Sequence, residues 1–396
     1  MNDRNVLPRT LVLIPFLLLA ACSDSNNSPQ PVVGPIQEPA DFSAADAWLE
    51  QFVEAQELFP GGSMVIVDKN QGVIHKSAFG NQTEDSVVLL ASTSKVPTVT
   101  LLMALDEDDA NIDFDMQEPI VNYLPWLGVW DPAITTEHLV SNRSGIPGLR
   151  YVFTNQADYI PHFCQFIPTG NLSSCAETLF TTPLPTLPST PANTAFNYGG
   201  SQWQIAGGVA ETVGGGTWSQ LWHQYIAEPC AIEVARYGNN LSNPASWTGD
   251  PDSLVGLENP SLEGGLMSNL DDYAKLISMH LNDGACGDRR VLSPEAIAFI
   301  RETRTSAVGA GPGGVGSPAD WGYAMGWWII PPKDGGSIYL YVDPGFYGSI
   351  SWLDVERNYG GAVFFEEYTG VAGGVGSGAV INQLIPLIEA AIDAVR

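Results

Sequence analysis

The chain has 396 residues, of which 44% are hydrophobic and only 15% are charged, so it can bury a large core and its composition excludes disorder as the dominant state. It carries 44 acidic side chains against 16 Lys and Arg, a formal net charge of −28, which argues against a nucleic-acid partner because phosphate would be repelled. The 41 glycines and 29 prolines indicate many turns and loops rather than a helical bundle.

The first residues have the pattern of an export signal. Arg4 and Arg9 precede an apolar run over 11–21, which is too short for a membrane-spanning helix of roughly 20 residues and is typical of a signal peptide. Small residues before Cys22 resemble the bacterial lipobox, whose cysteine becomes the lipidated first residue of the mature chain. Ser23 follows where Asp would favour inner-membrane retention, so we expect an outer-membrane lipoprotein, periplasmic or cell-surface. The alternative is an ordinary cleaved signal with an incidental cysteine.

The composition divides the chain into three predicted parts. Residues 1–21 are the signal peptide, 22–40 are rich in Ser, Asn and Pro and predict a flexible tether, and 41–396 form the folded domain. Apolar residues at helical spacing after Ser43 predict the first helix of this domain, and Asp46 gives it a start that is similar to a capping box.

Strand patterns place a sheet at both ends of the domain. The predicted strands cover 64–67, 72–79, 326–330, 337–342, 349–354 and 361–366, and further predicted helices cover 92–105, 202–213, 270–281 and 378–395. The expected fold class is α+β: an antiparallel sheet from 41–90 and 320–396, flanked by terminal helices, with a mainly helical lobe over about 91–319.

Four cysteines remain after Cys22, namely Cys164, Cys175, Cys230 and Cys286. An even number in an exported chain is compatible with disulfides, for which three pairings can be drawn. Proximity in sequence favours Cys164 with Cys175, which leaves Cys230 with Cys286. Metal ligation is the alternative, but no CxxC or HExxH spacing occurs, so we expect no metal.

Ser92-Thr-Ser-Lys95 stands at the start of the helix predicted over 92–105. Residues i and i+3 share one helix face, so the Ser92 hydroxyl and the Lys95 amine can meet. A lysine can deprotonate a serine if burial depresses its pKa, and the helix N-terminus favours a developing oxyanion. The alternative is an ordinary helix start with a solvated lysine. Apolar residues over 87–91 and 96–102 favour the catalytic interpretation.

Other motifs follow in order along the chain: Gly62–Asp68, Tyr123-Leu-Pro125, the segment 136–147, Gly264-Gly-Leu266 with Asp271-Asp272, and 291–295. With Ser92-Thr-Ser-Lys95, they resemble the serine β-lactamase-like hydrolases over about residues 44–395. This superfamily includes class C β-lactamases, D-alanyl-D-alanine carboxypeptidases and family VIII carboxylesterases. The resemblance implies a β-lactamase/transpeptidase-like fold and an acyl-enzyme on Ser92, formed without metal or organic cofactor.

The second motif of that superfamily, Tyr-x-Asn, is altered. Tyr198 matches the tyrosine, and the resemblance implies that its phenol shares proton transfer with Lys95. Gly200 stands in place of the asparagine, which hydrogen-bonds the substrate amide in the family. Its loss argues against an efficient β-lactamase. The alternative for Tyr198 is a tyrosine of the core or of the pocket rim.

The third motif, Lys-Thr-Gly or His-x-Gly, is matched by Asp343-Pro-Gly345. Gly345 would let substrate approach the strand, and the resemblance implies an oxyanion hole made by the N–H groups of Ser92 and Phe346. Asp343 stands where a cation holds a substrate carboxylate, and we expect it to repel one. This change favours neutral esters or amides. The alternative for this segment is a simple turn between strands.

We therefore expect an exported serine hydrolase, first a carboxylesterase on neutral small-molecule esters, then an amidase or D-amino peptidase, then a weak β-lactamase. It would contact a membrane through its lipid anchor only. The hypothesis of another class is a catalytically silent envelope-binding protein.

An aromatic segment predicts either an apolar acyl pocket or core under a long loop; its members are Tyr151, Phe153, Tyr159, Phe163, Phe166 and Phe180.

Overall fold

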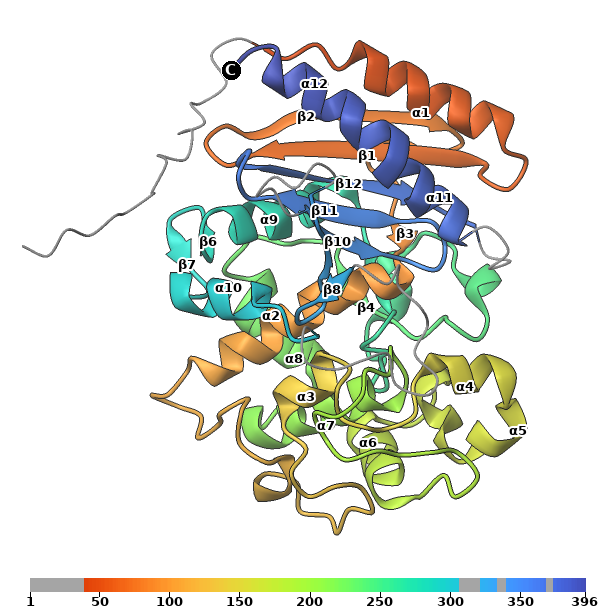
Figure 1. The fold of residues 1–396 in the computed structure, drawn as a ribbon, viewed down its shortest axis with the longest axis vertical. Helices are drawn as coiled ribbons and strands as arrows, with labels where there is room; N and C mark the ends of the chain where they lie inside the picture. The colour runs from red at the N-terminus through yellow and green to blue at the C-terminus, as the bar shows by residue number, and fades with distance from the viewer. Residues whose placement is uncertain (1–38, 306–320, 333–339, 368–372) are drawn as a thin grey trace, which may run out of the picture. The chain divides into compact units, whose positions relative to one another are not determined.

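Both ends of the described chain build one seven-stranded sheet (Figure 1). The computed structural model describes residues 39–305, 321–332, 340–367 and 373–396, and the strand order is β2-β1-β12-β11-β10-β9-β8. The bounds are β1 Gly61–Asp68, β2 Gly72–Gly80, β8 Gly322–Tyr323, β9 Trp328–Ile330, β10 Leu340–Pro344, β11 Ile350–Asp354 and β12 Tyr359–Phe365. All neighbours pair antiparallel, which confirms the predicted class. The predicted signal peptide, the predicted tether up to residue 38 and the start of the strand predicted at 337–342 lie outside the described residues.

Helices cover both faces of this sheet, which is why every residue of β1 is buried. Side chains alternate between the faces of a strand. Met64 and Ile66 share a core cluster with α1 (Ser43–Ala55) and α12 (Ile385–Asp393), whereas Val65 and Val67 share one with α9 (Leu270–Leu281). The continuous apolar run in β1 therefore reflects burial on two sides.

The first helix begins where the pattern predicts, but the expected cap does not form. Phe42 is the N-cap residue and has no side-chain capping bond. The Asp46 carboxylate instead lies 2.7 Å from Nε2 of His75 on β2. The expectation of a capping box at Ser43 was therefore wrong, because a cross-element partner occupies Asp46.

The last helix is longer than predicted and begins before residue 378. It runs through α11 (Gly373–Ala379), a π-helical turn η7 (Val380–Leu384) and α12. By length and composition alone the stretch Gly374–Asp393 could cross a membrane. It packs instead as a core helix, because its apolar face lies in the same cluster as the sheet through Val380, Leu384, Ile388 and Ile392, all 0% exposed.

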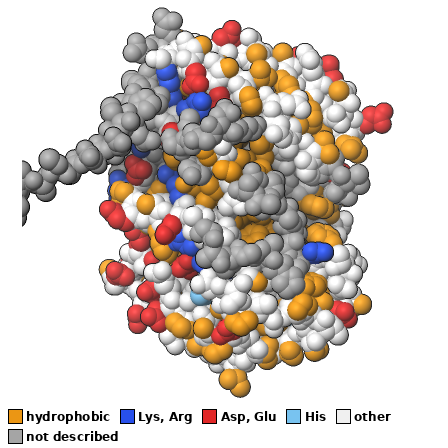
Figure 2. Space-filling model, in the orientation of Figure 1, with side chains coloured by type: hydrophobic (Ala, Val, Ile, Leu, Met, Phe, Trp, Pro, Cys, Tyr) orange, Lys and Arg blue, Asp and Glu red, His pale blue; other side chains and the backbone are white. Residues whose placement is uncertain are grey.

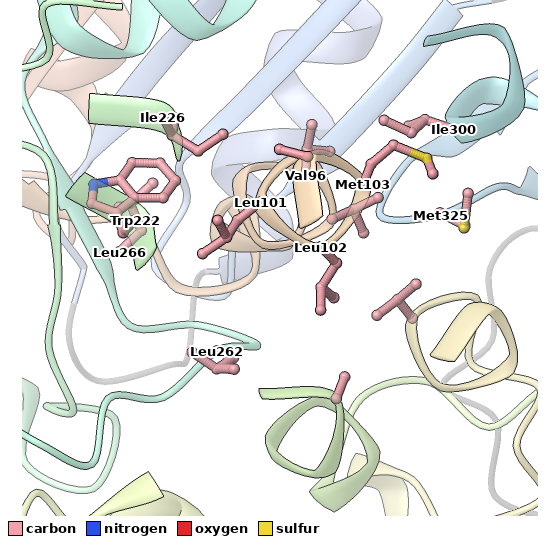
Figure 3. Close-up of a cluster of buried hydrophobic side chains, with 14 of the residues drawn as sticks. Val96, Leu101, Leu102, Met103, Trp222, Ile226, Leu262, Leu266, Ile300 and Met325 are labelled. Atoms are coloured by element: carbon pink, nitrogen blue, oxygen red, sulfur yellow. The ribbon is translucent and has the colours of Figure 1, made fainter. Parts of the chain in front are cut away.

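The helix α2 (Lys95–Asp106) belongs to the helical lobe over about 91–319, and the 3-10 turn η1 (Ala91–Ser94) precedes it. Apolar side chains leave α2 on several sides and point toward neighbouring segments, among them Trp222, Leu262 and Ile300 (Figure 3). Every residue of α2 except Asp106 is buried. A helix that is apolar all round needs such an enclosure, and this burial holds the N-terminal end of α2 in place.

The remaining helices are η2 Ile120–Asn122, α3 Thr136–Val140, α4 Leu149–Thr154, α5 Gln156–Tyr159, η3 Ile160–Phe166, α6 Leu172–Thr181, α7 Ser201–Gly214, α8 Trp218–Trp222, η4 His223–Ala227, η5 Pro244–Ser246, η6 Pro251–Leu254 and α10 Pro294–Arg301. Short strands β3 Val88–Leu89, β4 Arg236–Tyr237 and β5 Leu266–Ser268 form a second sheet, and β6 Ala285–Cys286 pairs with β7 Arg289–Arg290. Although α9 falls inside the segment 91–319, it packs on β1 and β12.

All four cysteines of the described chain form disulfides. Cys164 pairs with Cys175, with Cα atoms 5.7 Å apart, and Cys230 pairs with Cys286, with Cα atoms 5.0 Å apart. This is the pairing that proximity favours, and it occupies the thiols that a metal would need. Within the described ranges, no group of three or more His, Cys, Asp or Glu side chains could hold a metal ion.

Candidate active site

Ser92 lies in a turn that neighbouring elements hold rigidly. Ala91 before it has a φ of 49°, a left-handed conformation that non-glycine residues adopt at a cost and often at functional sites. Thr93 Oγ1 donates to the carbonyl of Asp343 at 2.8 Å, and Ser94 Oγ donates to the carbonyl of Ala91 at 2.6 Å. These bonds fix the backbone on both sides of Ser92, whose side chain lines a pocket.

Lys95 is completely buried and contacts the Ser92 hydroxyl. Its Nζ donates to Ser92 Oγ at 3.0 Å and to the carbonyl of Glu263 at 2.7 Å. Burial lowers the pKa of Lys95, while the nearby carboxylates of Glu263 and Asp343 oppose that shift. A lowered pKa enlarges the fraction of neutral amine, which is the form that can accept the serine proton. The solvated-lysine alternative was wrong.

Tyr198 joins this pair from the loop before α7. Its phenol is hydrogen-bonded to Ser92, and Lys95 Nζ lies 4.7 Å from the centre of its ring. Trp328 packs against the ring with centroids 5.2 Å apart. Burial raises the pKa of Tyr198 well above its ordinary value, so the phenol keeps its proton at neutral pH. Ser92, Lys95 and Tyr198 therefore meet at one point, as the resemblance implied.

Glu263 was missed in the sequence and stands beside these three residues. Its Oε2 lies 3.8 Å from Lys95 Nζ and accepts a hydrogen bond from the N–H of Gly200 at 2.8 Å. The residue is 4% exposed and lines the pocket. The available signal was an acidic residue directly before Gly264-Gly265, inside a segment that is otherwise almost uncharged. Only the fold brings it to Lys95, which is 168 positions away.

Gly200 does more than lack the asparagine side chain. Its φ is 87° with ψ −164°, a combination that essentially only glycine adopts. A Cβ at this position would lie 3.1 Å from the carbonyl of Pro147 and from the hydroxyl of Tyr159. The backbone of this loop therefore disfavours asparagine here.

Asp343 does not take the place expected for it. Its carboxyl is buried, is absent from the described pocket lining, and accepts a hydrogen bond from the N–H of Val96 at 3.2 Å. The first N–H groups of a helix have no partner within the helix and attract a carboxylate. The expectation that Asp343 faces a substrate carboxylate was therefore wrong, because it turns toward the N-terminal end of α2. Burial raises the pKa of Asp343 well above its ordinary value.

Gly345 and Phe346 form a turn that also lines the pocket. The N–H of Gly345 donates to the carbonyl of Ser349 at 2.6 Å, so the alternative of a turn between strands is correct. A Cβ on Gly345 would lie 2.2 Å from the carbonyl of Leu90. Position 345 therefore needs a glycine because the backbone of Leu90, just before Ser92, packs directly against it. The approach of substrate to this strand is a second reason for a glycine. Phe346 stacks on Phe153 at a centroid distance of 5.9 Å.

The pocket has a volume of about 680 Å³ and a mainly apolar lining: Leu149, Val152, Phe153, Phe163, Phe166, Leu241, Trp321, Trp328, Phe346, Tyr347 and Ile381. Glu263 is the one charged side chain among the described lining residues. Both interpretations of the aromatic segment hold in part, because Phe153, Phe163 and Phe166 line the pocket while Tyr159 and Phe180 are core. Figure 2 shows hydrophobic side chains toward the middle of one face and acidic side chains spread around it.

Comparison with known proteins agrees with this geometry. The family model described as Beta-lactamase matches residues 45–378. Penicillin-binding protein 4 of Amycolatopsis lactamdurans is 25% identical over 331 residues, which cover 75% of this chain and 82% of that protein.

Two solved structures share the fold. EstCE1, a hydrolase with promiscuous acyltransferase activity, has a TM-score of 0.66 and 16% identity and covers 89% of this chain and 98% of its own. The D-amino acid amidase of Ochrobactrum anthropi SV3 has a TM-score of 0.61 and 16% identity. The match covers 88% of this chain and 98% of the amidase chain. With the matched family model and the meeting of Ser92, Lys95 and Tyr198, the chain belongs to the beta-lactamase family of hydrolases.

Proposed function

We propose that this protein is an exported carboxylesterase that acts on neutral esters with apolar acyl groups through an acyl-enzyme on Ser92. One observation carries the proposal. The Lys95 amine lies 3.0 Å from Ser92 Oγ at the wall of an apolar pocket whose described lining contains no Lys, Arg or His. Such a pocket supplies no cation for a substrate carboxylate, and burying a carboxylate without one is costly.

Acylation follows from the positions of the three side chains. Lys95 accepts the proton of Ser92, and Oγ attacks the ester carbonyl. The N–H groups of Ser92 and Phe346 hold the oxyanion, since both residues line the pocket. When the carbon–oxygen bond to the alcohol breaks, the phenol of Tyr198 donates a proton to the leaving oxygen and recovers it from Lys95.

Several features support an ester over a β-lactam. The backbone at Gly200 disfavours the asparagine that would recognise a substrate amide. The missing cation removes the partner of the carboxylate that penicillins and peptidyl-D-alanine carry. An amidase or D-amino peptidase remains the second candidate, because the Glu263 carboxylate would attract a substrate ammonium. The contact between Lys95 and Ser92 argues against a silent binding protein.

The test compares hydrolysis of p-nitrophenyl esters from acetate to octanoate with a chromogenic cephalosporin and D-alanine p-nitroanilide. We expect ester turnover to exceed the other two and to increase with acyl length. Ser92→Ala should lower turnover by roughly 10³-fold or more, and Ser219→Ala, at an exposed serine of α8 that does not line the pocket, is the matched control. Near-normal activity in Ser92→Ala would sink the assignment. Preferential turnover of the anilide would favour the amidase.

We also propose that the protein is a lipoprotein of the outer membrane, anchored through Cys22. The support is the pattern of residues 1–23 in the sequence.

A further inference from the structure

One carboxylate oxygen in the pocket has no partner. Oε2 of Glu263 accepts from the N–H of Gly200, but Oε1 is buried without a hydrogen-bond partner among the described residues. A buried carboxylate oxygen left unpaired costs free energy. Room for this side chain depends on a glycine, since a Cβ on Gly199 would lie 2.6 Å from Oε2. The site is therefore built around a carboxylate that still lacks a donor.

The position of this carboxylate suits a water molecule that attacks the acyl-enzyme. Ser92 Oγ and Glu263 Oε2 lie 3.0 Å and 3.8 Å from the same Lys95 Nζ, and both residues line one pocket. Acylation, as proposed above, uses Lys95 and Tyr198 and gives Glu263 no role. A hydrolase needs a base for its second step, and a carboxylate beside the nucleophile in a pocket without other described charges can supply it.

We infer that Glu263 is the base for deacylation and that its carboxylate removes a proton from the hydrolytic water. The inference rests on the proposed function. The water oxygen bonds to the acyl carbon, and its proton passes to Glu263. The bond from the acyl carbon to Ser92 Oγ then breaks, and Oγ takes a proton from the phenol of Tyr198. The phenolate recovers that proton from Glu263 through Lys95, whose Nζ lies 3.8 Å from Glu263 Oε2 and 4.7 Å from the centre of the Tyr198 ring. The enzyme thus returns to its starting state with one acid released.

The electrostatics of the site agree with this role. Burial raises the pKa of Glu263, and the neighbouring Lys95 and the N–H of Gly200 hold it down. A carboxyl group with a raised pKa is a stronger base once ionised, and a pKa nearer to the working pH favours general-base catalysis. The hydrogen bond from the N–H of Gly200 to Oε2 holds the Glu263 carboxylate in one orientation.

The experiment uses Glu263→Gln, in which the amide oxygen can still accept from the N–H of Gly200 while the base is lost. With p-nitrophenyl butyrate, we expect a burst of about one p-nitrophenol per enzyme followed by a steady-state rate lower by about 100-fold or more. Intact mass should show a butyryl adduct that accumulates in the variant and is lost in Ser92→Ala combined with Glu263→Gln. Glu258→Gln, an exposed residue nearby in the chain, should behave like the unchanged protein.

A second measurement keeps the inference testable. Hydroxylamine attacks acyl-enzymes without a base, so we expect it to restore p-nitrophenol release by Glu263→Gln. Loss of the burst together with the steady state would overturn the inference and assign Glu263 to the positioning of Lys95. An unchanged steady-state rate would also overturn it. If instead the unchanged protein never forms a Ser92 adduct, the proposed function itself fails, which is a separate and visible outcome.

Discussion

At the scale of single residues, the site depends on the burial of Lys95. An ammonium removed from water is costly, and its pKa falls in consequence. The two acceptors at 3.0 Å and 2.7 Å hold the amine against Ser92 and the Glu263 carbonyl. A solvated lysine would stay protonated at neutral pH and would be a poor base.

The most restrictive single position beside the nucleophile is Gly345. We expect Gly345→Ala to destabilise the protein by about 1–3 kcal/mol and to lower ester turnover by at least tenfold. A Cβ would meet the carbonyl of Leu90 at 2.2 Å and Thr93 Oγ1 at 2.9 Å, and so would displace the turn that carries Ser92. Urea unfolding and ester hydrolysis measure the two effects. Gly216→Ala, where the nearest atom is a side-chain oxygen at 3.3 Å, is the control. Full activity in Gly345→Ala would contradict this account.

At the scale of elements, α2 joins the nucleophile to the core. Its N-terminal end receives the Asp343 carboxyl and carries Lys95, while its apolar sides are enclosed as in Figure 3. Its last residue, Asp106, accepts from the N–H of Met116 at 2.6 Å. The helix thus carries a partly buried carboxyl group at the end opposite to the site.

Asp106 predicts a pH-dependent stability. Burial, with the nearby charges of Asp115 and Glu107, raises the pKa of Asp106 to about 6. A carboxyl whose pKa is raised on folding is harder to ionise in the folded state, so this residue lowers stability as pH rises from about 4 to above 6. We expect Asp106→Asn to stabilise the protein by up to about 2 kcal/mol at pH 8 and by much less at pH 4. Urea unfolding at both pH values measures this difference in stability, with Asp288→Asn, at an exposed residue, as control. An equal effect at both values would refute the assignment.

At the scale of the whole molecule, the pocket is assembled from distant parts of the described chain. The turn after β10, the helices around η3, the loop before α7 and the C-terminal helix each contribute lining residues. The disulfide between Cys164 and Cys175 joins η3, which lines the pocket, to α6, and the second disulfide joins Cys230 to Cys286. The predicted signal peptide and the predicted lipid anchor at Cys22 would hold this domain at a membrane.

The anchor has its own test in a bacterial host that processes lipoproteins. We expect Cys22→Ala to move the protein from the membrane fraction to the soluble fraction and to abolish labelling by a palmitate analogue, because the acylated atom is gone. Ser23→Asp should keep the label and shift the protein toward the inner membrane. Fractionation and labelling measure both. An unlabelled protein that stays in the membrane fraction with Cys22→Ala would show that the lipobox interpretation is wrong.

The sequence by itself determined whatever depends on short separations along the chain. The helix predicted over 270–281 is α9 without a change of bounds, and the strands β1 and β2 follow their apolar pattern. Ser92 and Lys95 meet because a helical turn brings i and i+3 together. The cysteine pairing favoured by proximity is also present. The order and spacing of the motifs along the chain also indicate the family that the matched family model shows.

Only the tertiary structure decided how distant residues face one another. Asp343 is 247 positions from Val96, and its side chain turns to the N-terminal end of α2 rather than into the pocket. Glu263 approaches Lys95 across 168 positions, and Asp46 pairs with His75 instead of capping its helix. Local propensity cannot predict these contacts, because each is selected by burial: a charged group taken from water must find a partner, and the fold determines which partner lies within reach.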